Sequence, residues 1–463
     1  MKRKLLYLIL FLIAVSIRLL INFKFDLLPG ANGGYYPLQV RCLLTNGHLG
    51  FSDMPLYFYF NAFLVKCASL FTDAPSNSLI MRVVKTSDSF FLPLLLIPLF
   101  GICKALTKFK LPFYQEYLIA AFAVISISPL ILTGDLQKNG FAIPLLFTFF
   151  LFGIQYLIAP SKRILLLTLL FFVLTGITHF GTFAVGAITL IICLIFYKGK
   201  KALIPIMTVG LITVGLIAIF DTTRALRFVN VLSEIFIHPS LFKGLPGPPG
   251  ILNYLFSYAL IGTGIHCLKK QKEKMDSKDR VIIITLTILV FILSFPLLNV
   301  EYAKRLTLML FVPQSILMMV LFMFTGKPMK AGLIIFALLI MIFGMGVLRL
   351  KKPVITSTAY AELIQLKEYI PVGDNTLVIA RHGLEWWIGW ALQTKIGNEK
   401  GIDQTVLKEY ENVIFIHQKK GVNELAPGGK DLFYKVFKEP NPPFGKLNEL
   451  YTTEFYSVYE WNY

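Results

Sequence analysis

Charged residues are scarce in this chain. Only 15% of its 463 residues are Asp, Glu, Lys or Arg, whereas soluble globular proteins carry about 25%. Apolar runs of roughly 18 residues or more recur instead, and each is long enough to cross a bilayer as a helix. Because these runs are continuous rather than alternating, they exclude a transmembrane β-barrel. The composition therefore predicts a polytopic α-helical membrane protein.

The signatures of several enzyme classes are also missing. The chain has no Gly-rich phosphate loop, no Walker motif, no HExxH and no GxSxG, so nothing in it indicates nucleotide or serine hydrolysis. Its five cysteines are far apart and form no CxxC pair. An odd number of cysteines at such spacing implies neither a disulfide framework nor a zinc site.

Positive charge is abundant, but its distribution does not indicate nucleic-acid binding. The net charge is +19, yet residues 353–463 hold 11 Lys/Arg against 14 Asp/Glu. The positive excess therefore lies between the apolar runs, where it orients the chain during membrane insertion. We expect no nucleic-acid partner.

About eleven transmembrane helices are predicted. The first, at residues 5–22, follows the basic segment 1–4 and has no small-residue cleavage site, so we expect it to be retained with a cytoplasmic N-terminus. Residues 54–71 are apolar but interrupted by polar side chains, and a span there would move the basic segment 269–280 outside. We therefore expect 54–71 to lie on the outer surface or to re-enter. The other ten spans are expected at 88–106, 117–133, 141–159, 164–178, 183–197, 202–220, 251–268, 281–298, 306–325 and 331–348.

Residues 353–463 are expected to form a small external α/β domain, and residues 1–352 are expected to form the membrane domain. A tail of this length can bury a small core. Trp386, Trp387 and Trp390 suit that core, which is the interpretation we favour, or a carbohydrate-binding face. The expected elements are an amphipathic helix at 361–370, buried strands at 375–380 and 412–417, and a helical segment at 381–392.

The long first external loop, from Arg18 to Asn61, is too polar to span the membrane and is expected to carry surface helices. It holds Asp26, four residues past the first span, and Asp53. A carboxylate there could act as a general base on an acceptor, bind a divalent cation, or simply be solvated. The acids expected on the outer side are Asp26, Asp53, Asp73, Asp88, Asp135, Asp221, Glu234 and Glu301.

A second external turn, GDLQKNG (134–140), contains Asp135 and Lys138. Its glycines let the chain reverse, so both side chains are expected to face the same crevice as the first loop. The alternative for Asp135 is a helix-capping role.

Cationic side chains near the outer ends of the spans are candidate phosphate ligands. Arg18 and Arg305 offer a permanently charged planar fork of donors, although both could instead reach toward the membrane interface. His179, in the turn THFGT, could contact a sugar or phosphate, or cap the turn.

This layout resembles the GT-C superfamily of integral-membrane glycosyltransferases, which use lipid-linked sugar donors. Protein O-mannosyltransferases, aminoarabinose transferases and oligosaccharyltransferase catalytic subunits are similar, with a large first external loop and often an external C-terminal domain. GANGGYYPLQVRCLLTNG (30–47) and SDMPLYFYFNA (52–62) resemble segments of that loop. GDLQKNG occupies the place of a second acidic motif, and GLEWWIGW (383–390) is weakly similar to a Trp-Trp motif.

The resemblance implies transfer of a sugar from a polyprenyl-phosphate or polyprenyl-diphosphate donor to a protein, lipid or glycan acceptor. The reaction would take place on the outer face of the cell membrane, with the tail also external, and a divalent cation such as Mg²⁺ or Mn²⁺ could assist. The candidate catalytic residues are Asp26, Asp53 and Asp135, and the candidate donor-binding residues are Arg18, Arg41, Lys138, His179 and Arg305.

The chain departs from the family pattern at Asn32, which stands where these families place a carboxylate just before the Tyr-Tyr pair. An amide cannot act as a carboxylate base. Either Asp26, Asp53 or Asp135 takes that role, or the chain has lost the chemistry. The alternatives to a transferase are therefore an inactive scaffold with bound partners, or a transporter or flippase of lipid-linked sugars, which would need acids or broken helices near mid-membrane.

Overall fold

The computed structural model describes residues 2–71, 76–220, 234–237, 239–242, 248–371, 373, 375–398, 407–421 and 447–461. Two compact units make up the chain, and both are assembled from separate stretches of sequence. Unit 1 comprises Met1–Leu19, Ser52–Tyr57 and Ser87–Leu348, and unit 2 comprises Leu20–Phe51, Phe58–Thr86 and Arg349–Tyr463. Unit 2 therefore contains the C-terminal tail together with most of the first loop, residues 20–51.

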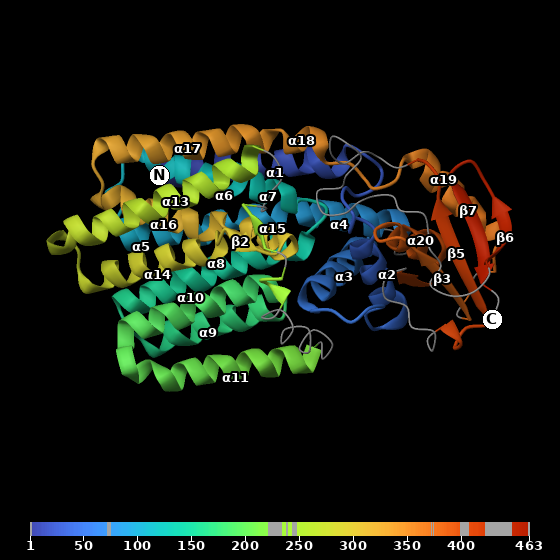
Figure 1. The fold of residues 1–463 in the computed structure, drawn as a ribbon, viewed down its shortest axis with the longest axis horizontal. Coiled ribbons are helices and arrows are strands. Elements are labelled where there is room, and N and C mark those ends of the chain that lie inside the picture. Colours follow the sequence, from blue (N-terminus) through green and yellow to red (C-terminus); the bar gives the residue numbers. More distant parts are fainter. Residues whose placement is uncertain are drawn as a thin grey trace. The chain divides into compact units, whose positions relative to one another are not determined.

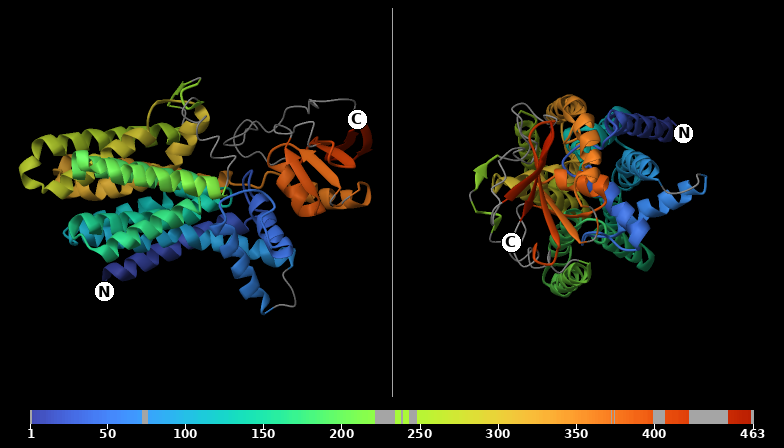
Figure 2. Two further views of the ribbon diagram at one scale, coloured as in Figure 1. Left: turned by 90° about the horizontal axis from the view of Figure 1, so that it is seen from below. Right: turned by 90° about the vertical axis from the view of Figure 1, so that its right-hand side faces the viewer.

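Unit 1 is a bundle of long apolar helices that run side by side (Figures 1 and 2). Each helix contributes residues from successive turns to the interior, because packing against neighbouring helices buries one stripe of each apolar helix. Its helices are α1 (Lys2–Phe23), α5 (Leu96–Thr107), α6 (Phe113–Ile125), α7 (Ile127–Leu132), α8 (Gln137–Ile158), α9 (Lys162–Gly176), α10 (Phe180–Lys198), α11 (Leu203–Phe220), α13 (Pro248–Lys270), α14 (Ser277–Leu293), α15 (Val300–Met309), α16 (Phe311–Phe324), α17 (Lys327–Met345) and α18 (Val347–Leu350). A short ladder pairs β1 (Ser240–Leu241) with β2 (Leu297–Leu298).

Each of the eleven predicted spans coincides with a helix or a run of helices. Among the described residues, seven helical stretches are long and apolar enough to cross a membrane, and the pair α15 and α16, bent by 45°, forms an eighth if it is one span. The remaining three predicted spans correspond to α9, α11 and α14, which have 15, 18 and 17 residues. The chain is a multi-pass membrane protein, as the composition predicts.

The helix that contains the second predicted span begins before it. Helix α4 (Asn77–Phe91) continues through the 3₁₀ turn Leu92–Leu95 into α5, and together they form a stretch of 31 residues. The first turns of α4 were not predicted as helix because they are amphipathic and carry charge, so they do not form a continuous apolar run.

Residues 54–71 form only a short helix, α3 (Leu56–Ser69), with 14 residues. At 1.5 Å per residue it is about 21 Å long, whereas the hydrocarbon core of a bilayer is about 30 Å thick. Helix α2 (Tyr35–Asn46) is shorter still, with 12 residues. Both lengths agree with the prediction of short helices in the first loop rather than an additional span.

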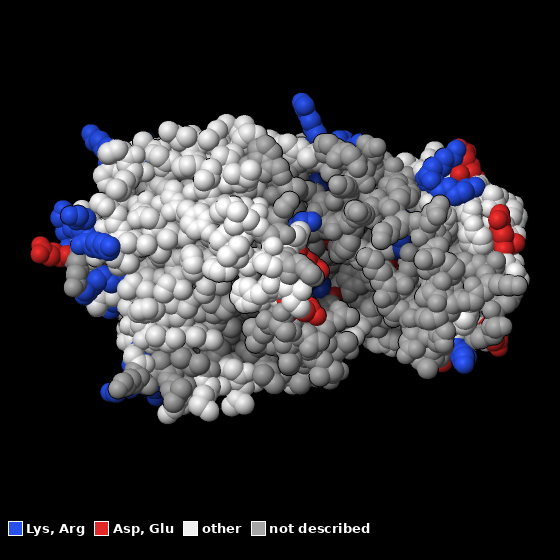
Figure 3. Space-filling view, in the orientation of Figure 1, with Lys and Arg blue, Asp and Glu red and all other residues white. Residues whose placement is uncertain are grey.

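Lys and Arg gather at one end of the unit 1 helices, while the described sides of the bundle carry few charges (Figure 3). The basic residues come from the turns that join α5 to α6, α8 to α9, α10 to α11, α13 to α14 and α16 to α17. Uncharged sides and a basic end are typical of helices that cross a membrane.

The C-terminal part of unit 2 contains a five-stranded sheet in the order β4-β3-β5-β7-β6. β3 pairs in parallel with β4 and β5, and β7 pairs antiparallel with β5 and β6. Both predicted strands and both predicted helices are confirmed, so the tail is α/β. The elements are β3 (Thr376–Ala380), β4 (Lys395–Asn398), β5 (Asn412–Gln418), β6 (Leu447–Thr452), β7 (Tyr456–Trp461), α19 (Ser357–Gln365), a 3₁₀ turn (Leu366–Glu368) and α20 (Leu384–Leu392).

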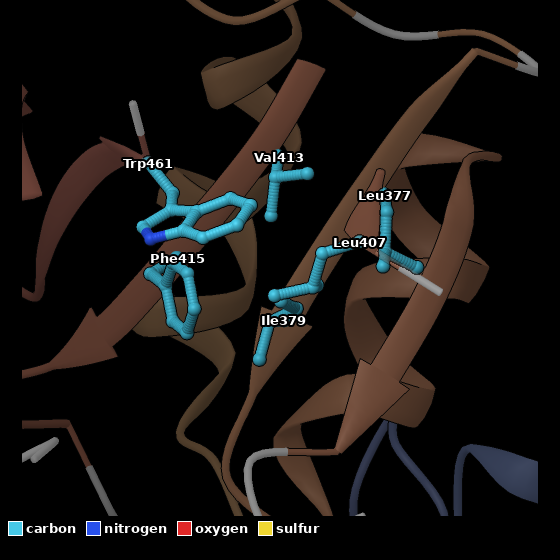
Figure 4. Close-up of a cluster of buried hydrophobic side chains, with 6 residues drawn as sticks. All are labelled: Leu377, Ile379, Leu407, Val413, Phe415 and Trp461. Carbon is cyan, nitrogen blue, oxygen red and sulfur yellow. The ribbon is translucent and has the colours of Figure 1, made fainter. Parts of the chain in front are cut away.

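The core of this sheet follows from strand alternation. Side chains two residues apart on a strand share a face, so Leu377 and Ile379 of β3 lie beside Val413 and Phe415 of β5 in Figure 4. Leu407 and Trp461 complete this buried cluster. The face is apolar throughout, which explains why these strands are recognisable in the sequence.

The tail also packs on residues of the first external loop within unit 2. Trp387 is fully buried, and a Cβ on Gly34 would lie 3.0 Å from its ring, so the glycine permits close approach. The ring of Trp386 lies 4.8 Å from that of Tyr35 and 5.2 Å from that of Phe51. The tryptophans therefore belong to the core of unit 2, as favoured from the sequence.

Candidate functional site

Five charged side chains of unit 1 are buried together with the turn between α7 and α8. We refer to them as the charged cluster: Arg18, Asp53, Asp88, Asp135 and Lys138. Burying a charge costs several kcal/mol unless a partner and hydrogen bonds compensate for the lost hydration. The contacts of the cluster show how that compensation is made.

Arg18 of α1 is fully buried, and protein oxygens occupy its guanidinium. Its Nη2 lies 3.3 Å from Asp88 Oδ1, and its Nε and Nη2 also donate to the carbonyl oxygen of Asp88. Its Nη1 donates to the carbonyl oxygen of Pro129 at 2.9 Å, near the end of α7, where helix carbonyls lack intrahelical partners. The guanidinium thus ties α1 to α4 and α7. In this arrangement its donors are used within the protein, so its predicted contact with phosphate has no structural support.

Asp88 connects Arg18 to the second external turn. Its Oδ2 accepts a hydrogen bond of 2.9 Å from the backbone N–H of Gly134, so the two carboxylate oxygens hold different elements. Gly134 has φ +77°, a left-handed conformation that costs other residues roughly 1–2 kcal/mol. The glycine therefore lets the chain reverse at the point where its amide meets Asp88.

The remainder of the turn is held by Asp53 and Tyr57. Lys138 forms a buried ion pair with Asp53 Oδ2, while Asp53 Oδ1 accepts from the backbone N–H of Met54 at 2.8 Å. The hydroxyl of Tyr57 donates to Gln137 Oε1, and Gln137 Nε2 donates to the carbonyl oxygen of Gly134 at 3.0 Å. Residues 134–138 are therefore fixed at both ends and in the middle.

Asp135 lies inside this turn and is only 3% exposed. The structure thus brings two of the three predicted catalytic carboxylates, Asp53 and Asp135, to one turn with Lys138. Lys138 is paired with the carboxylate of Asp53. A carboxylate can accept a proton or orient a hydroxyl, and the ammonium can bind a phosphate oxygen.

The third predicted carboxylate, Asp26, belongs to unit 2 and has an exposed side chain. Its carbonyl oxygen and that of Phe25 accept hydrogen bonds of 2.7 and 2.6 Å from Lys85 Nζ. Asn32, at the departure from the family pattern, is half-buried, and its carbonyl oxygen accepts from the backbone N–H of Tyr35 at the start of α2.

Arg41 of unit 2 has a structural set of contacts. Its guanidinium donates to the carbonyl oxygens of Trp390 at 2.7 Å and Gly389 at 2.6 Å, and lies over the Trp390 ring. These carbonyls belong to the last turn of α20, where a cation is favoured. Burial lowers the pKa of Arg41 from its ordinary value. The residue therefore fastens α20 to α2 rather than facing a donor.

The other two predicted ligands lie apart from these contacts. His179 caps α10, because its Nδ1 accepts from the backbone N–H of Thr182 at 3.1 Å, which was the alternative considered for it. Arg305 is exposed and pairs with Glu301 one turn earlier at 2.5 Å. Of the remaining predicted acids, Asp73 and Asp221 lie outside the described residues.

The sequence interpretation did not single out Asp88 of the charged cluster, or Tyr57, which holds the turn through Gln137. Asp88 was only one of eight outer acids, and Tyr57 one of many aromatic residues. Their partners lie 46 and 80 positions away, so no local spacing reveals them.

Within the part of the chain that the structure describes, no group of three or more His, Cys, Asp or Glu side chains is arranged to hold a metal ion. The carboxylate of Asp53 is used by Lys138, and that of Asp88 by Arg18 and Gly134. These residues do not fit a divalent cation as arranged, and no step below depends on one.

Comparisons with known proteins agree on the fold. No protein-family model and no curated protein sequence matches the chain significantly. Among solved structures, the chain is similar to apo oligosaccharyltransferase from Archaeoglobus fulgidus, with a TM-score of 0.57, 10% identity, and coverage of 89% of this chain and 69% of that one. It is also similar to apo ArnT from Cupriavidus metallidurans, with a TM-score of 0.54, 8% identity, and coverage of 98% and 97%. Likeness at this identity carries the fold alone, and the chain has a GT-C-like fold.

Proposed function

We propose that this protein is a glycosyltransferase that moves a sugar from a polyprenyl-phosphate or polyprenyl-diphosphate donor to an acceptor on the outer face of the cell membrane. The observation that carries the proposal is the charged cluster, a buried turn with two carboxylates and an ammonium in a chain with a GT-C-like fold. Buried charges inside a membrane protein are costly, and they tend to mark function.

The location of the cluster supports the outer face. Its turn joins α7 to α8, whereas the basic turns join the opposite ends of successive helices. Basic turns stay in the cytoplasm. The proposal therefore has the N-terminus in the cytoplasm and both the cluster and the C-terminal domain outside.

Sugar transfer requires a base for the acceptor proton and a cation for the leaving group, and the cluster has groups suited to both. The acceptor hydroxyl or amine must lose a proton as its oxygen or nitrogen bonds to the anomeric carbon, and Asp53 or Asp135 would take that proton. The bond between the anomeric carbon and the donor phosphate oxygen breaks, and the polyprenyl phosphate or diphosphate leaves with the bonding electrons. Lys138 would stabilise the negative charge that develops on that leaving group.

This assignment changes the roles expected of two residues. Arg18 would act through Asp88, holding the turn in place, rather than on the donor phosphate. Asp26, exposed and in the other unit, would not be the base. Asn32 is then no obstacle, because the carboxylates of the cluster replace the one missing there.

The test is transfer of radiolabel from a panel of polyprenyl-phosphate and polyprenyl-diphosphate sugars in membranes that contain the protein. We expect Asp53→Asn and Asp135→Asn to lower the rate, by roughly 10²–10⁴-fold for the variant that removes the base. Glu273→Gln, an exposed acid in a basic turn, serves as the control and should keep the wild-type rate.

Three outcomes would reject the proposal in distinct ways. Undiminished transfer by the Asp53→Asn, Asp135→Asn double variant would show that the cluster is not catalytic. Movement of label across the membrane without covalent change would identify a transporter. No turnover of any donor, with tightly bound protein partners, would identify a scaffold.

A further inference from the structure

Unit 1 contains an apolar cavity far from the charged cluster along the helices. It has a volume of about 370 Å³ and lies between α8, α9, α10, α11 and α14. Cavities of roughly 300–1,000 Å³ are the size that holds small ligands. Helix α11 lies at the edge of the bundle (Figures 1 and 2), so one wall of the cavity is a peripheral helix.

Most side chains that line the cavity are apolar, and three of its threonines have occupied hydroxyl donors. Thr168, Thr189 and Thr208 each donate to the carbonyl oxygen four residues earlier in their own helix, at 2.8, 2.7 and 3.0 Å. The hydroxyl of Thr285, which also lines it, has no hydrogen-bond partner among the described residues. Ordered water needs two to four polar partners, and apolar cavities stay dry. The natural occupant of such a space within a membrane is hydrocarbon.

The cavity lies toward the basic end of the bundle. Its walls come from the last half of α8 and α10 and from the first half of α9 and α11. Leu165 and Ile204, which line it, are 39% and 76% exposed. Lys198, the last residue of α10, also lines it and is exposed, and the basic turns 161–163 and 198–201 adjoin it.

We propose that this cavity binds an acyl chain of an anionic membrane phospholipid, with the lipid phosphate held by Lys198. Basic pockets between transmembrane helices bind anionic head groups, and each Lys or Arg near the surface contributes about fivefold in affinity. The chain would fill the dry space while the phosphate stays at the helix end. This proposal does not depend on the proposed glycosyltransferase activity.

The position of the cavity argues against the sugar donor as occupant. Lys138 is at the start of α8, and Leu157, which lines the cavity, is near its end. Nineteen residues of helix separate them, which is about 29 Å. One phosphate cannot contact both Lys138 and Lys198.

The cavity can be filled by substituting a glycine that lines it. Gly153 of α8 lines it, and a Cβ added there would meet no atom within 4 Å. Gly153→Leu should therefore occupy the space without disturbing the helices. Gly332→Leu is the matched control, since Gly332 is also helical, also half-buried and also open to a Cβ, but it lies in α17, outside the cavity.

The experiment uses the full-length protein in phosphatidylcholine vesicles that contain phosphatidylglycerol with a diazirine in its acyl chain. After illumination, we expect crosslinked peptides from α8, α9 and α10, abolished by Gly153→Leu and kept by Gly332→Leu. Lys198→Gln should lower labelling by phosphatidylglycerol about fivefold while leaving labelling by the matching phosphatidylcholine probe unchanged.

Several results would overturn the proposal. Crosslinks on wild-type protein that map to other helices would reject the cavity, and this result needs no variant to fold. Equal labelling by the charged and zwitterionic probes would reject the role of Lys198. Stronger displacement of the probe by undecaprenyl phosphate than by unlabelled phosphatidylglycerol would identify a carrier lipid as the occupant.

Discussion

Replacing Asp88 with Asn tests how the buried turn is held. Asp88 Oδ1 faces the Arg18 guanidinium and Oδ2 faces the Gly134 N–H. Both neighbours are donors, so the amide of Asn must point its NH₂ group at one of them. The substitution also leaves the fully buried charge of Arg18 without its counter-ion. Removing one partner of a buried pair costs about 3–5 kcal/mol.

This cost can be expressed as a melting temperature. With an unfolding entropy of about 2.1 cal/mol/K per residue over 463 residues, a loss of about 3–5 kcal/mol corresponds to a fall of about 3–5 °C. Unfolding in detergent can be followed with a thiol-reactive fluorophore, because Cys103 and Cys267 are fully buried in the folded protein. Heating exposes both thiols, and the fluorescence midpoint gives the melting temperature.

An exposed pair of the same chemistry provides the control. Arg305 and Glu301 form an ion pair with side chains 65% and 66% exposed, and such pairs contribute little to stability. Glu301→Gln should therefore leave the midpoint almost unchanged. Equal midpoints for Asp88→Asn and Glu301→Gln would refute the argument that burial makes the Arg18–Asp88 pair stabilising. A combined Arg18→Met, Asp88→Asn variant should lose less than the sum of the single losses.

Three further predictions concern the turn and unit 2. Gly134→Ala should slow transfer of labelled sugar, because a residue with a side chain is strained by about 1–2 kcal/mol at φ +77°. Gly47→Ala, at the same φ but outside the cluster, should leave transfer unchanged. Lys138→Met should lower the melting temperature because it leaves the buried carboxylate of Asp53 without its ion-pair partner. Adding Asp53→Asn should restore the melting temperature but should not restore sugar transfer. Arg41→Lys should destabilise unit 2 by about 1–2 kcal/mol, since lysine cannot donate to both carbonyl oxygens at the end of α20 in the way the guanidinium does. Faster proteolysis of the tail would reveal this destabilisation, and an unchanged rate of proteolysis would contradict it.

The sequence predicts the membrane helices and the tail strands well because both depend on local composition. A bilayer requires long apolar runs wherever the chain crosses it, and the strands at 376–380 and 412–418 are buried, apolar and short. The start of α4 was missed because its first turns obey a different pattern, amphipathic rather than uniformly apolar. Membership of the first loop in unit 2 could not be predicted, since it depends on contacts between distant segments.

The site was predicted only in part, for the same reason. Asp53, Asp135 and Lys138 are recognisable as isolated polar residues in outer loops, but the sequence does not reveal that Lys138 pairs with Asp53, 85 positions away. Arg18 was interpreted from its charge alone, and its partner Asp88 lies 70 positions away. The pair of Arg305 with Glu301, by contrast, follows from the spacing of four residues on a helix.

The way unit 2 is assembled has a consequence for biosynthesis. Arg41 must find a carbonyl that lies 349 positions later in the chain. At about 5–20 residues per second, the ribosome needs roughly 17–70 s to supply it. During that interval Tyr35 and Phe51 have no Trp386 to cover them. A nascent chain that stalls or is truncated before the tail would therefore present an uncovered aromatic surface that proteases and chaperones can recognise.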